Sequence, residues 1–156
     1  METTATDDKL RWNLGDLYAS PDDPRLAVDM AKASDRASEL ARSYRGRMAA
    51  LKPVELAEAI RGYEQLMDLA YRPGLYASLL FAGQTADEKA QALLDRTRQA
   101  TTEAFNEVKF VDIELKKIPD DAFARLLDAP ELKPYRHFLA AQRKLAPYTL
   151  DRKSVV

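Results

Sequence analysis

The stretch that decides the fold is residues 24–46, PRLAVDMAKASDRASELARSYRG. Its apolar side chains recur at alternating steps of four and three residues: Leu26, Met30, Ala33, Ala37, Leu40 and Tyr44. This spacing places them on one face of an α-helix. Asp23 before Pro24 is typical of a helix start, and Gly46 is typical of a helix end. The stretch therefore predicts an amphipathic helix.

A second helix is predicted from Pro53, because apolar residues repeat with the same spacing up to Ala70. Pro73-Gly74 is expected to end or kink this helix, since proline lacks an N–H and clashes with the preceding turn. Gly62 weakens the pattern, because glycine costs up to about 1 kcal/mol relative to alanine inside a helix. The apolar segment 75–81 either continues the helix after a kink or forms a separate turn.

A third helix is predicted over residues 86–117, with Thr85 and Glu88 as a capping box at its start. At 1.5 Å per residue it would be about 48 Å long. A compact chain of this size has a diameter of about 39 Å. We therefore expect an elongated bundle rather than a broken helix.

The C-terminal part predicts two shorter helices, over residues 119–127 and 135–145, separated by Pro130 and Pro134. No segment alternates apolar and polar residues as a strand would, and no hairpin turn signal occurs. The predicted fold is all-α: an elongated antiparallel bundle with three long helices and shorter C-terminal helices.

Composition narrows the possible functions. The 156 residues include 24 Lys and Arg, 25 Asp and Glu, one histidine and no cysteine. The balanced charge disfavours nucleic acid as a partner. Without cysteine there is no disulfide, thiolate nucleophile or cysteine-based zinc site. The polar start lacks the features of a secretory signal, and no apolar run approaches the roughly 20 residues that span a bilayer. We expect a cytoplasmic protein with no membrane partner.

The single imidazole, His137, is the first candidate for chemistry. The residues four positions away are Lys133 and Ala141, and those three positions away are Pro134 and Ala140. None is a carboxylate that could orient the ring or share a metal ion. His137 is therefore expected to have a structural or surface role.

Acidic pairs form a second group: Asp7-Asp8, Asp22-Asp23, Asp120-Asp121, and Asp112 with Glu114. Paired acids can act as general acid and base where burial separates their pKa values. Asp22-Asp23 and Asp120-Asp121 lie beside prolines at helix starts, where negative charge meets the positive end of the helix. Capping is the expected role of these two pairs.

Four tyrosines fall on or near the apolar faces of the predicted helices: Tyr44, Tyr63, Tyr71 and Tyr76. Such rings either pack in the core or line a groove for a peptide. Core packing is the favoured interpretation. The five scattered glycines form no phosphate-binding loop.

One segment is more specific than these. The residues Trp12-Asn13-Leu14-Gly15-Asp16-Leu17-Tyr18, followed by an acidic turn at Asp22-Asp23, resemble the opening of oligoendopeptidase F-type proteins, whose pattern is Trp-Asp-Leu-x-x-Leu-Tyr. Trp12, Leu14, Leu17 and Tyr18 are expected to anchor this segment to the bundle.

The resemblance continues in order along residues 12–150. Tyr44-Arg45-Gly46 is similar to the Tyr-x-Gly that ends the first helix of that family, and Tyr63-Glu64 to a pair on its second helix. Residues 110–115, with Glu114, are similar to an aromatic-then-acidic stretch. Residues 132–139 and 143–150 resemble Leu-x-x-Tyr-x-x-x-Leu and Arg-x-x-x-Pro-x-x-Leu.

The resemblance implies an N-terminal helical lobe of a zinc metallopeptidase that cuts short peptides inside a channel. The family binds zinc through His-Glu-x-x-His and a downstream glutamate, and none of this motif is present here. No catalytic, cofactor-binding or metal-binding residue is therefore assigned to this chain, which is predicted to be inactive alone. The resemblance implies zinc only for a separate catalytic domain. That domain is the expected partner within the same polypeptide, and oligopeptides are the expected substrates.

The predicted organisation is a flexible tail over residues 1–11, the lobe over residues 12–150, and an atypical end over residues 151–156. That end departs from the acidic helix of the family, as a truncated, cloned or frameshifted terminus would. The role implied for the lobe is to wall the substrate channel. The alternative is a stand-alone helical module that binds a partner protein or dimerises through its apolar faces.

Overall fold

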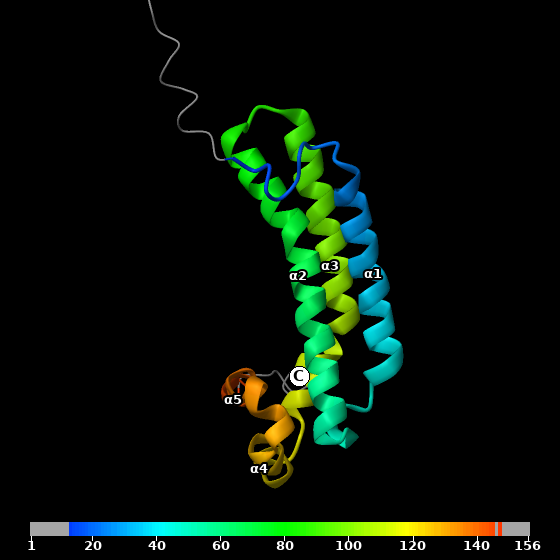
Figure 1. Ribbon diagram of the computed structural model, residues 1–156, viewed down its shortest axis with the longest axis vertical. Helices are drawn as coiled ribbons and strands as arrows, with labels where there is room; N and C mark the ends of the chain where they lie inside the picture. The colour runs from blue at the N-terminus through cyan, green and yellow to red at the C-terminus, as the bar shows by residue number, and fades with distance from the viewer. Residues whose placement is uncertain (1–12, 146, 148–156) are drawn as a thin grey trace, which may run out of the picture. The chain divides into compact units, whose positions relative to one another are not determined.

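The computed structural model describes residues 13–145 and 147, which are organised entirely by helices (Figure 1). Three helices are long: α1 (Pro24–Tyr44), α2 (Pro53–Gly83) and α3 (Glu88–Lys116). Two α-helices are short, α4 (Asp120–Asp128) and α5 (Arg136–Leu145), and 3-10 turns occupy Met48–Ala50 (η1) and Pro130–Tyr135 (η2). The all-α prediction, with three long and several shorter helices, is confirmed. The expectations for Trp12, Asp7-Asp8, the tail 1–11 and the end 151–156 concern residues outside the described part.

The boundaries of α1 follow its sequence signals. Oδ1 of Asp23 accepts a hydrogen bond from the backbone N–H of Arg25 at 2.9 Å, as expected of an N-cap. Gly46 follows the helix with φ of +78°, a left-handed conformation that favours glycine. The predicted start and stop of this helix are both confirmed.

Pro73 does not end α2, which continues to Gly83 and includes the segment 75–81. The residues after the proline are held by packing, since Tyr76 and Ala77 are buried in a cluster with side chains of α3. In the turn before it, the carbonyl of Ala70 accepts a hydrogen bond from the Thr101 hydroxyl at 3.1 Å. Burial of this apolar segment outweighs the roughly 3 kcal/mol by which proline disfavours a helix interior.

The expected capping box at Thr85 and Glu88 is wrong. The backbone N–H of Lys89 donates to Oδ1 of Asp87 at 2.8 Å, so Asp87 caps α3 and Glu88 is its first residue. Aspartate is among the best N-cap residues, and here it directly precedes the helix. As expected, α3 is not broken: it runs continuously from Glu88 to Lys116.

The chain divides into two compact units, each with its own core. The described part of the first unit comprises residues 13–35 and 66–104. Its buried cluster contains Tyr18, Leu26, Tyr76, Ala77, Leu93 and Leu94, with Leu14, Leu17, Leu80 and Phe81 packed against it. Tyr18 is thus the confirmed anchor of the segment before α1, and Leu14 and Leu17 support it.

The second unit comprises residues 36–65 and the described residues from Phe105 onward. Its fully buried side chains include Met48, Leu56, Ile60, Val108, Leu115, Ile118, Leu132 and Leu139. The short helices α4 and α5 contribute to this core through Phe123 and Leu139. None of the helices in the described part of the chain combines the length and apolarity that crossing a membrane requires.

Candidate functional site

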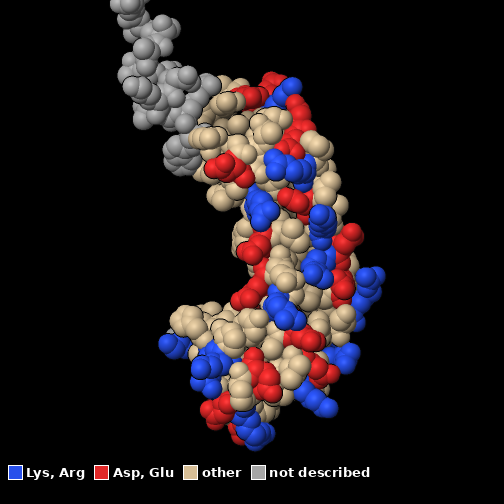
Figure 2. Space-filling view, viewed as in Figure 1, with Lys and Arg blue, Asp and Glu red and all other residues tan. Residues whose placement is uncertain are grey.

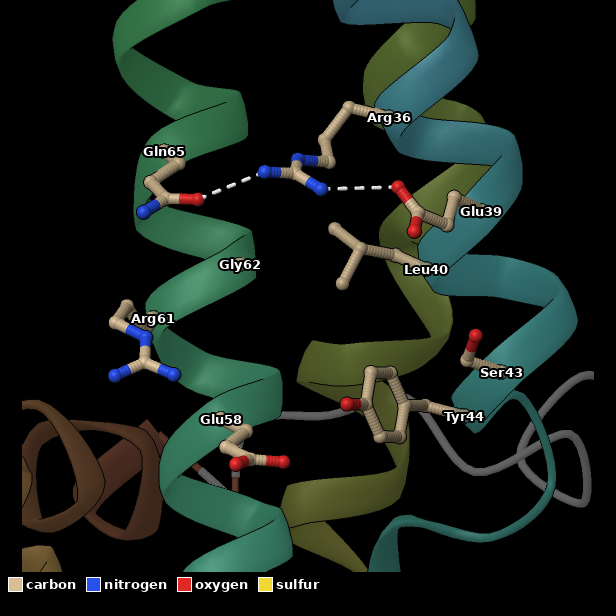
Figure 3. A pocket seen from close by; sticks show the side chains of 9 residues that line it. All are labelled: Arg36, Glu39, Leu40, Ser43, Tyr44, Glu58, Arg61, Gly62 and Gln65. Carbon is tan, nitrogen blue, oxygen red and sulfur yellow. Dashed lines mark hydrogen bonds and ion pairs between the residues drawn. The ribbon is translucent and has the colours of Figure 1, made fainter.

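A polar groove lies between α1 and α2 within the second unit (Figure 3). Its volume is about 230 Å³. The lining residues are Arg36, Glu39, Leu40, Ser43 and Tyr44 of α1 with Glu58, Arg61, Gly62 and Gln65 of α2. The helical repeat explains this set, because residues three or four apart along each helix face the same neighbour.

Arg36 bridges the two walls of the groove. One guanidinium nitrogen, Nη2, donates to Oε1 of Gln65 on α2 at 3.0 Å, while Nη1 donates to Oε2 of Glu39 at 2.9 Å (Figure 3). These bonds use both ends of the planar guanidinium group. They fix one end of the groove.

Gly62 allows α1 and α2 to approach closely at the middle of the groove. A Cβ atom at this position would lie 3.0 Å from Cδ2 of Leu40, closer than ordinary contact. The glycine that weakens the helical pattern of α2 therefore has a packing role. Leu40 is buried beneath the polar rim.

The other end of the groove carries Ser43 and Tyr44 on α1, and Glu58 and Arg61 on α2 (Figure 3). Two hydroxyls, a carboxylate and a guanidinium can hydrogen-bond to the backbone or the charged groups of a polar ligand. The lining contains neither histidine nor cysteine. The groove thus offers hydrogen-bonding and charged groups that can bind a polar ligand.

His137 lies on α5 and is exposed, which is consistent with the expected surface role. Within residues 13–145 and 147, no group of three or more histidine, aspartate and glutamate side chains is placed to hold a metal ion. The residues present therefore do not fit the zinc site of the family that the sequence resembles. No chemical step can be assigned to zinc on this part of the chain.

The acidic pairs have different roles. Asp23 is buried and accepts bonds from Arg25 and from the N–H of Ala19, whereas Asp22 is exposed. Hydrogen bonding to Arg25 holds the pKa of the Asp23 carboxyl far below its usual range. The capping expectation is correct for Asp23 alone.

Asp120 and Asp121 lie in the first turn of α4, but neither caps it. The N-cap position is Pro119, which makes no side-chain capping bond. Asp120 instead pairs with Arg143 of α5, and Asp121 with Arg125 at 3.2 Å. Both acids therefore lie where negative charge meets the positive end of the helix, as expected, but neither makes a capping hydrogen bond.

Glu114 has a role that the sequence did not predict. Its two carboxylate oxygens accept the backbone N–H groups of Gly46 at 2.7 Å and Met48 at 3.1 Å. Glu114 therefore holds the turn after α1, while Asp112 forms an ion pair with Lys116 at 2.8 Å. The only sequence signal was the position of Glu114 in the aromatic-then-acidic pattern.

A second contact joins α3 to the same turn. Arg45 donates through Nη2 to Oε1 of Glu107 at 3.1 Å and to the Glu107 carbonyl at 2.7 Å, and its guanidinium lies 5.5 Å from the centre of the Phe110 ring. The Tyr-x-Gly and aromatic-then-acidic patterns of the sequence are thus brought together in space. The residues of both patterns make contacts that hold the turn after α1 against α3.

Two arginines of α5 donate hydrogen bonds to backbone carbonyls at the ends of other helices. Arg143 donates to the carbonyl of Lys116 at 3.2 Å and lies over the Phe123 ring at 4.9 Å, and Arg136 donates to the carbonyl of Leu127 at 2.7 Å. Carbonyls in the last turn of a helix have no partner within it. The arginine that opens the Arg-x-x-x-Pro pattern therefore caps the end of α3.

The four tyrosines have different surroundings. Tyr76 is buried, with its pKa raised by burial, and its ring meets that of Tyr18 at 5.2 Å between centres. Tyr63 packs against Phe138 with ring centres 6.2 Å apart, and Tyr44 lines the groove. Tyr71 is 58% exposed. Core packing is confirmed for Tyr76 only.

Charges of both signs alternate over the face of the molecule in Figure 2.

Comparison with protein families gives a match over the C-terminal part of the chain. Residues 114–154 match the model of a family described as Oligopeptidase F, in its N-terminal region. No curated protein and no solved structure matches the chain. The match begins at Glu114 and includes Arg143. Glu114 joins α3 to the turn after α1, and Arg143 joins α5 to the end of α3. This segment is similar to the N-terminal region of oligopeptidase F, which supports there the resemblance that the sequence suggested.

Proposed function

We propose that this chain is the N-terminal, non-catalytic lobe of an oligoendopeptidase F-like zinc metalloendopeptidase and walls the channel that admits short peptides. The observation that carries the proposal is the family match over residues 114–154. Zinc and the hydrolytic residues belong, in this proposal, to a catalytic portion of the same polypeptide. The helical lobe contributes shape and binding groups.

The groove between α1 and α2 is the surface through which the lobe would contact peptide. Peptides present backbone donors and acceptors at every residue, and the hydroxyls of Ser43 and Tyr44 can pair with either. Glu58 and Arg61 add one charge of each sign. The groove would therefore bind peptides with different affinities according to the positions of their charged residues.

Two measurements on the 156-residue chain test the absence of catalysis that the proposal requires. We expect no hydrolysis of a quenched fluorescent peptide and no stoichiometric zinc after dialysis. One tightly bound zinc per chain in metal analysis would contradict the proposal, because it would place the metal site within this lobe.

Translation of the coding DNA beyond residue 156, in all frames, tests whether a catalytic portion is encoded. The proposal expects a His-Glu-x-x-His pattern several hundred residues downstream. A gene that ends normally without this motif would instead favour the stand-alone interaction module.

The role of the groove can be measured in the longer polypeptide. Glu58→Lys reverses a charge in the groove, and Glu64→Lys makes the same change on the same helix outside it. We expect Glu58→Lys to change kcat/KM differently for acidic and basic peptides, whereas Glu64→Lys leaves their ratio unchanged. If both variants preserve the ratio, the groove does not face the substrate.

A further inference from the structure

The two ends of the groove between α1 and α2 differ in how their polar groups are used. At one end, both terminal nitrogens of Arg36 donate hydrogen bonds, to Glu39 and to Gln65. At the other end, which we call the open end, the side chains of Tyr44 and Glu58 line the groove (Figure 3). Among the residues that the structure describes, neither of these two side chains has a hydrogen-bond or ion-pair partner. The open end therefore presents polar groups with unused bonding capacity.

The register of the two helices explains why Tyr44 and Glu58 face each other. Leu40 lies one turn after Arg36 on α1 and packs against Gly62, one turn before the glutamine that Arg36 contacts on α2. Because α1 and α2 are thus antiparallel here, the next turn of each helix brings Tyr44 opposite Glu58. In Figure 3 the Tyr44 hydroxyl points toward α2 and the Glu58 carboxylate points toward α1. The two groups converge on the same space.

The charge at the open end favours a cation over an anion. Arg61 lies one turn from Glu58 on α2, but in Figure 3 its guanidinium group lies along α2 and does not point toward Tyr44. Arg47, beyond the end of α1, donates to the backbone carbonyl of Ser43 at 3.1 Å. The charge that faces Tyr44 is therefore the Glu58 carboxylate, which attracts a cation.

The floor of the groove is apolar. Leu40 is buried beneath the polar rim, and Gly62 adds no side chain beside it. A ligand with an apolar stem and a compact cationic head could lay its stem on Leu40 and its head between Tyr44 and Glu58. Lysine has this shape, because a flexible four-carbon stem carries an ammonium group with three N–H donors. The two carboxylate oxygens of Glu58 and the hydroxyl oxygen of Tyr44 offer an acceptor for each donor.

We propose that the open end of the groove is a subsite for the primary ammonium group of a peptide. The Glu58 carboxylate pairs with its charge, and the Tyr44 hydroxyl accepts one of its hydrogen bonds. A lysine side chain and a peptide N-terminus both carry this group, and the apolar floor favours the lysine stem. The inference deepens the proposed function by naming the substrate class, and it rests on that function for the peptide as ligand.

NMR titration of the isotope-labelled 156-residue chain tests the subsite with three probes. They are acetyl-Gly-Lys-Gly-amide, the same peptide with norleucine in place of lysine, and Gly-Gly-Gly-amide, whose N-terminus is free. Norleucine keeps an apolar stem and lacks the charge. We expect the lysine peptide to shift the backbone amide signals of Tyr44, Glu58 and Gly62, and the norleucine peptide to leave them in place.

The third probe identifies the source of the ammonium group. A stronger response to the lysine peptide than to Gly-Gly-Gly-amide would assign the subsite to a lysine side chain, and an equal response would assign it to the peptide N-terminus. Both results support the ammonium subsite. Equal responses to the lysine and norleucine peptides, or no response to either ammonium peptide at concentrations up to about 10 mM, would overturn it.

Variants of the 156-residue chain locate the binding. Glu58→Gln keeps the shape of the side chain and should weaken binding of the lysine peptide about tenfold, because it removes a charged acceptor. Tyr44→Phe keeps the ring and should weaken binding about threefold, since a neutral acceptor contributes less. Glu64→Gln, on the same helix outside the groove, is the matched control and should bind as the parent does. Equal affinities of the Glu58 and Glu64 variants would overturn the proposal.

The failure of this inference can be told apart from the failure of the proposed function. In an active longer polypeptide, Glu58→Gln should raise KM for a lysine-containing peptide and leave KM for its norleucine counterpart unchanged. An active polypeptide in which this variant treats both peptides alike would overturn the inference and leave the proposed function standing. A longer polypeptide without peptidase activity would refute the proposed function, while binding of the lysine peptide through Glu58 to the 156-residue chain would still support the subsite.

Discussion

In the first unit the segment before α1 is fixed by a buried aromatic side chain, whereas in the second unit the turn after α1 is fixed by a carboxylate. Tyr18 is 1% exposed, meets Tyr76 edge to face, and donates its hydroxyl to Asp29 at 2.7 Å. Glu114 instead accepts two backbone N–H groups from the turn. The first contact gains mainly from removing apolar area from water, and the second from charge-assisted hydrogen bonds.

The two contacts therefore respond differently to a change of pH and to the loss of a side chain. A buried ring holds its segment whatever the pH near neutrality, and burial raises the pKa of Tyr18 so that it stays neutral there. A carboxylate that accepts two backbone N–H groups orients a turn through hydrogen bonds, so its loss leaves unpaired donors. The segment matched to oligopeptidase F includes Glu114 and Arg143, so it is held by charged side chains that hydrogen-bond to the backbone.

The largest effect is expected for Tyr18→Ala. Removal of a fully buried aromatic ring should lower the free energy of unfolding by about 4 kcal/mol. Tyr18→Phe, the matched control, keeps the ring and loses only the bond to Asp29, at a cost of about 1 kcal/mol. Urea denaturation measures both, and equal losses would mean that the hydroxyl rather than the ring anchors the segment.

Glu114→Ala is expected to cost about 2 kcal/mol, because it removes a charged acceptor from two N–H groups. Glu103→Ala, on the same helix, removes an exposed carboxylate that accepts a bond from Gln99 and should cost less than about 0.5 kcal/mol. Chemical denaturation with hydrogen exchange at Gly46 and Met48 locates the effect. Unchanged exchange at these two amides would refute the role of Glu114.

The third prediction concerns acid stability in the first unit. The pKa of Asp23 is lowered on folding, so its stabilising contribution is present above its unfolded pKa of about 3.9 and is lost as the pH falls toward the lowered folded value. Asp23→Asn removes this contribution. The free energy of unfolding of the variant should therefore decline less steeply with acid below about pH 4 than that of the parent.

The control for this measurement is Asp22→Asn, which alters the exposed neighbour. Its acid dependence should follow that of the unsubstituted chain. Identical profiles for the Asp23 and Asp22 variants would show that the Asp23 contacts with Arg25 and Ala19 do not control acid stability.

The smallest effect is expected for Arg36→Ala in the groove. The Arg36 side chain is 40% exposed, and its partner Glu39 is 59% exposed. Exposed ion pairs contribute little, so the loss should be about 0.5 kcal/mol. Arg42→Ala, on an exposed position of the same helix, serves as the reference, and a loss above about 2 kcal/mol for Arg36→Ala would mean that the bridge to Gln65 is structurally essential.

Local sequence patterns determined the helices because helical order depends on residues three or four apart. The apolar spacing from Leu26 to Tyr44, the Asp23-Pro24 start and the left-handed Gly46 all appear in the structure as expected. The same reasoning left two outcomes open at Pro73, a helix that continues through the segment 75–81 or a separate turn, and packing selected the first. At Pro73, burial of the following turn continues a helix that proline alone would end.

The contacts that build the candidate site could not be read from local patterns. Glu114 meets Gly46 across 68 positions of sequence, Arg45 meets Glu107 across 62, and Arg36 meets Gln65 across 29. A surface arginine or glutamate has many possible partners, and only the packing of the helices selects one. The resemblance marked some of these positions without giving their physical role.

The sequence by itself determined an all-α chain, its main helix boundaries and its resemblance to oligopeptidase F, because periodicity and short motifs are encoded locally. The tertiary structure alone decided that α2 passes through Pro73, that Glu114 accepts the backbone N–H groups of the turn after α1, and that Arg143 donates to a carbonyl at the end of α3. These features depend on which helix faces meet, and that choice is made by burial and hydrogen bonding across long separations in the chain.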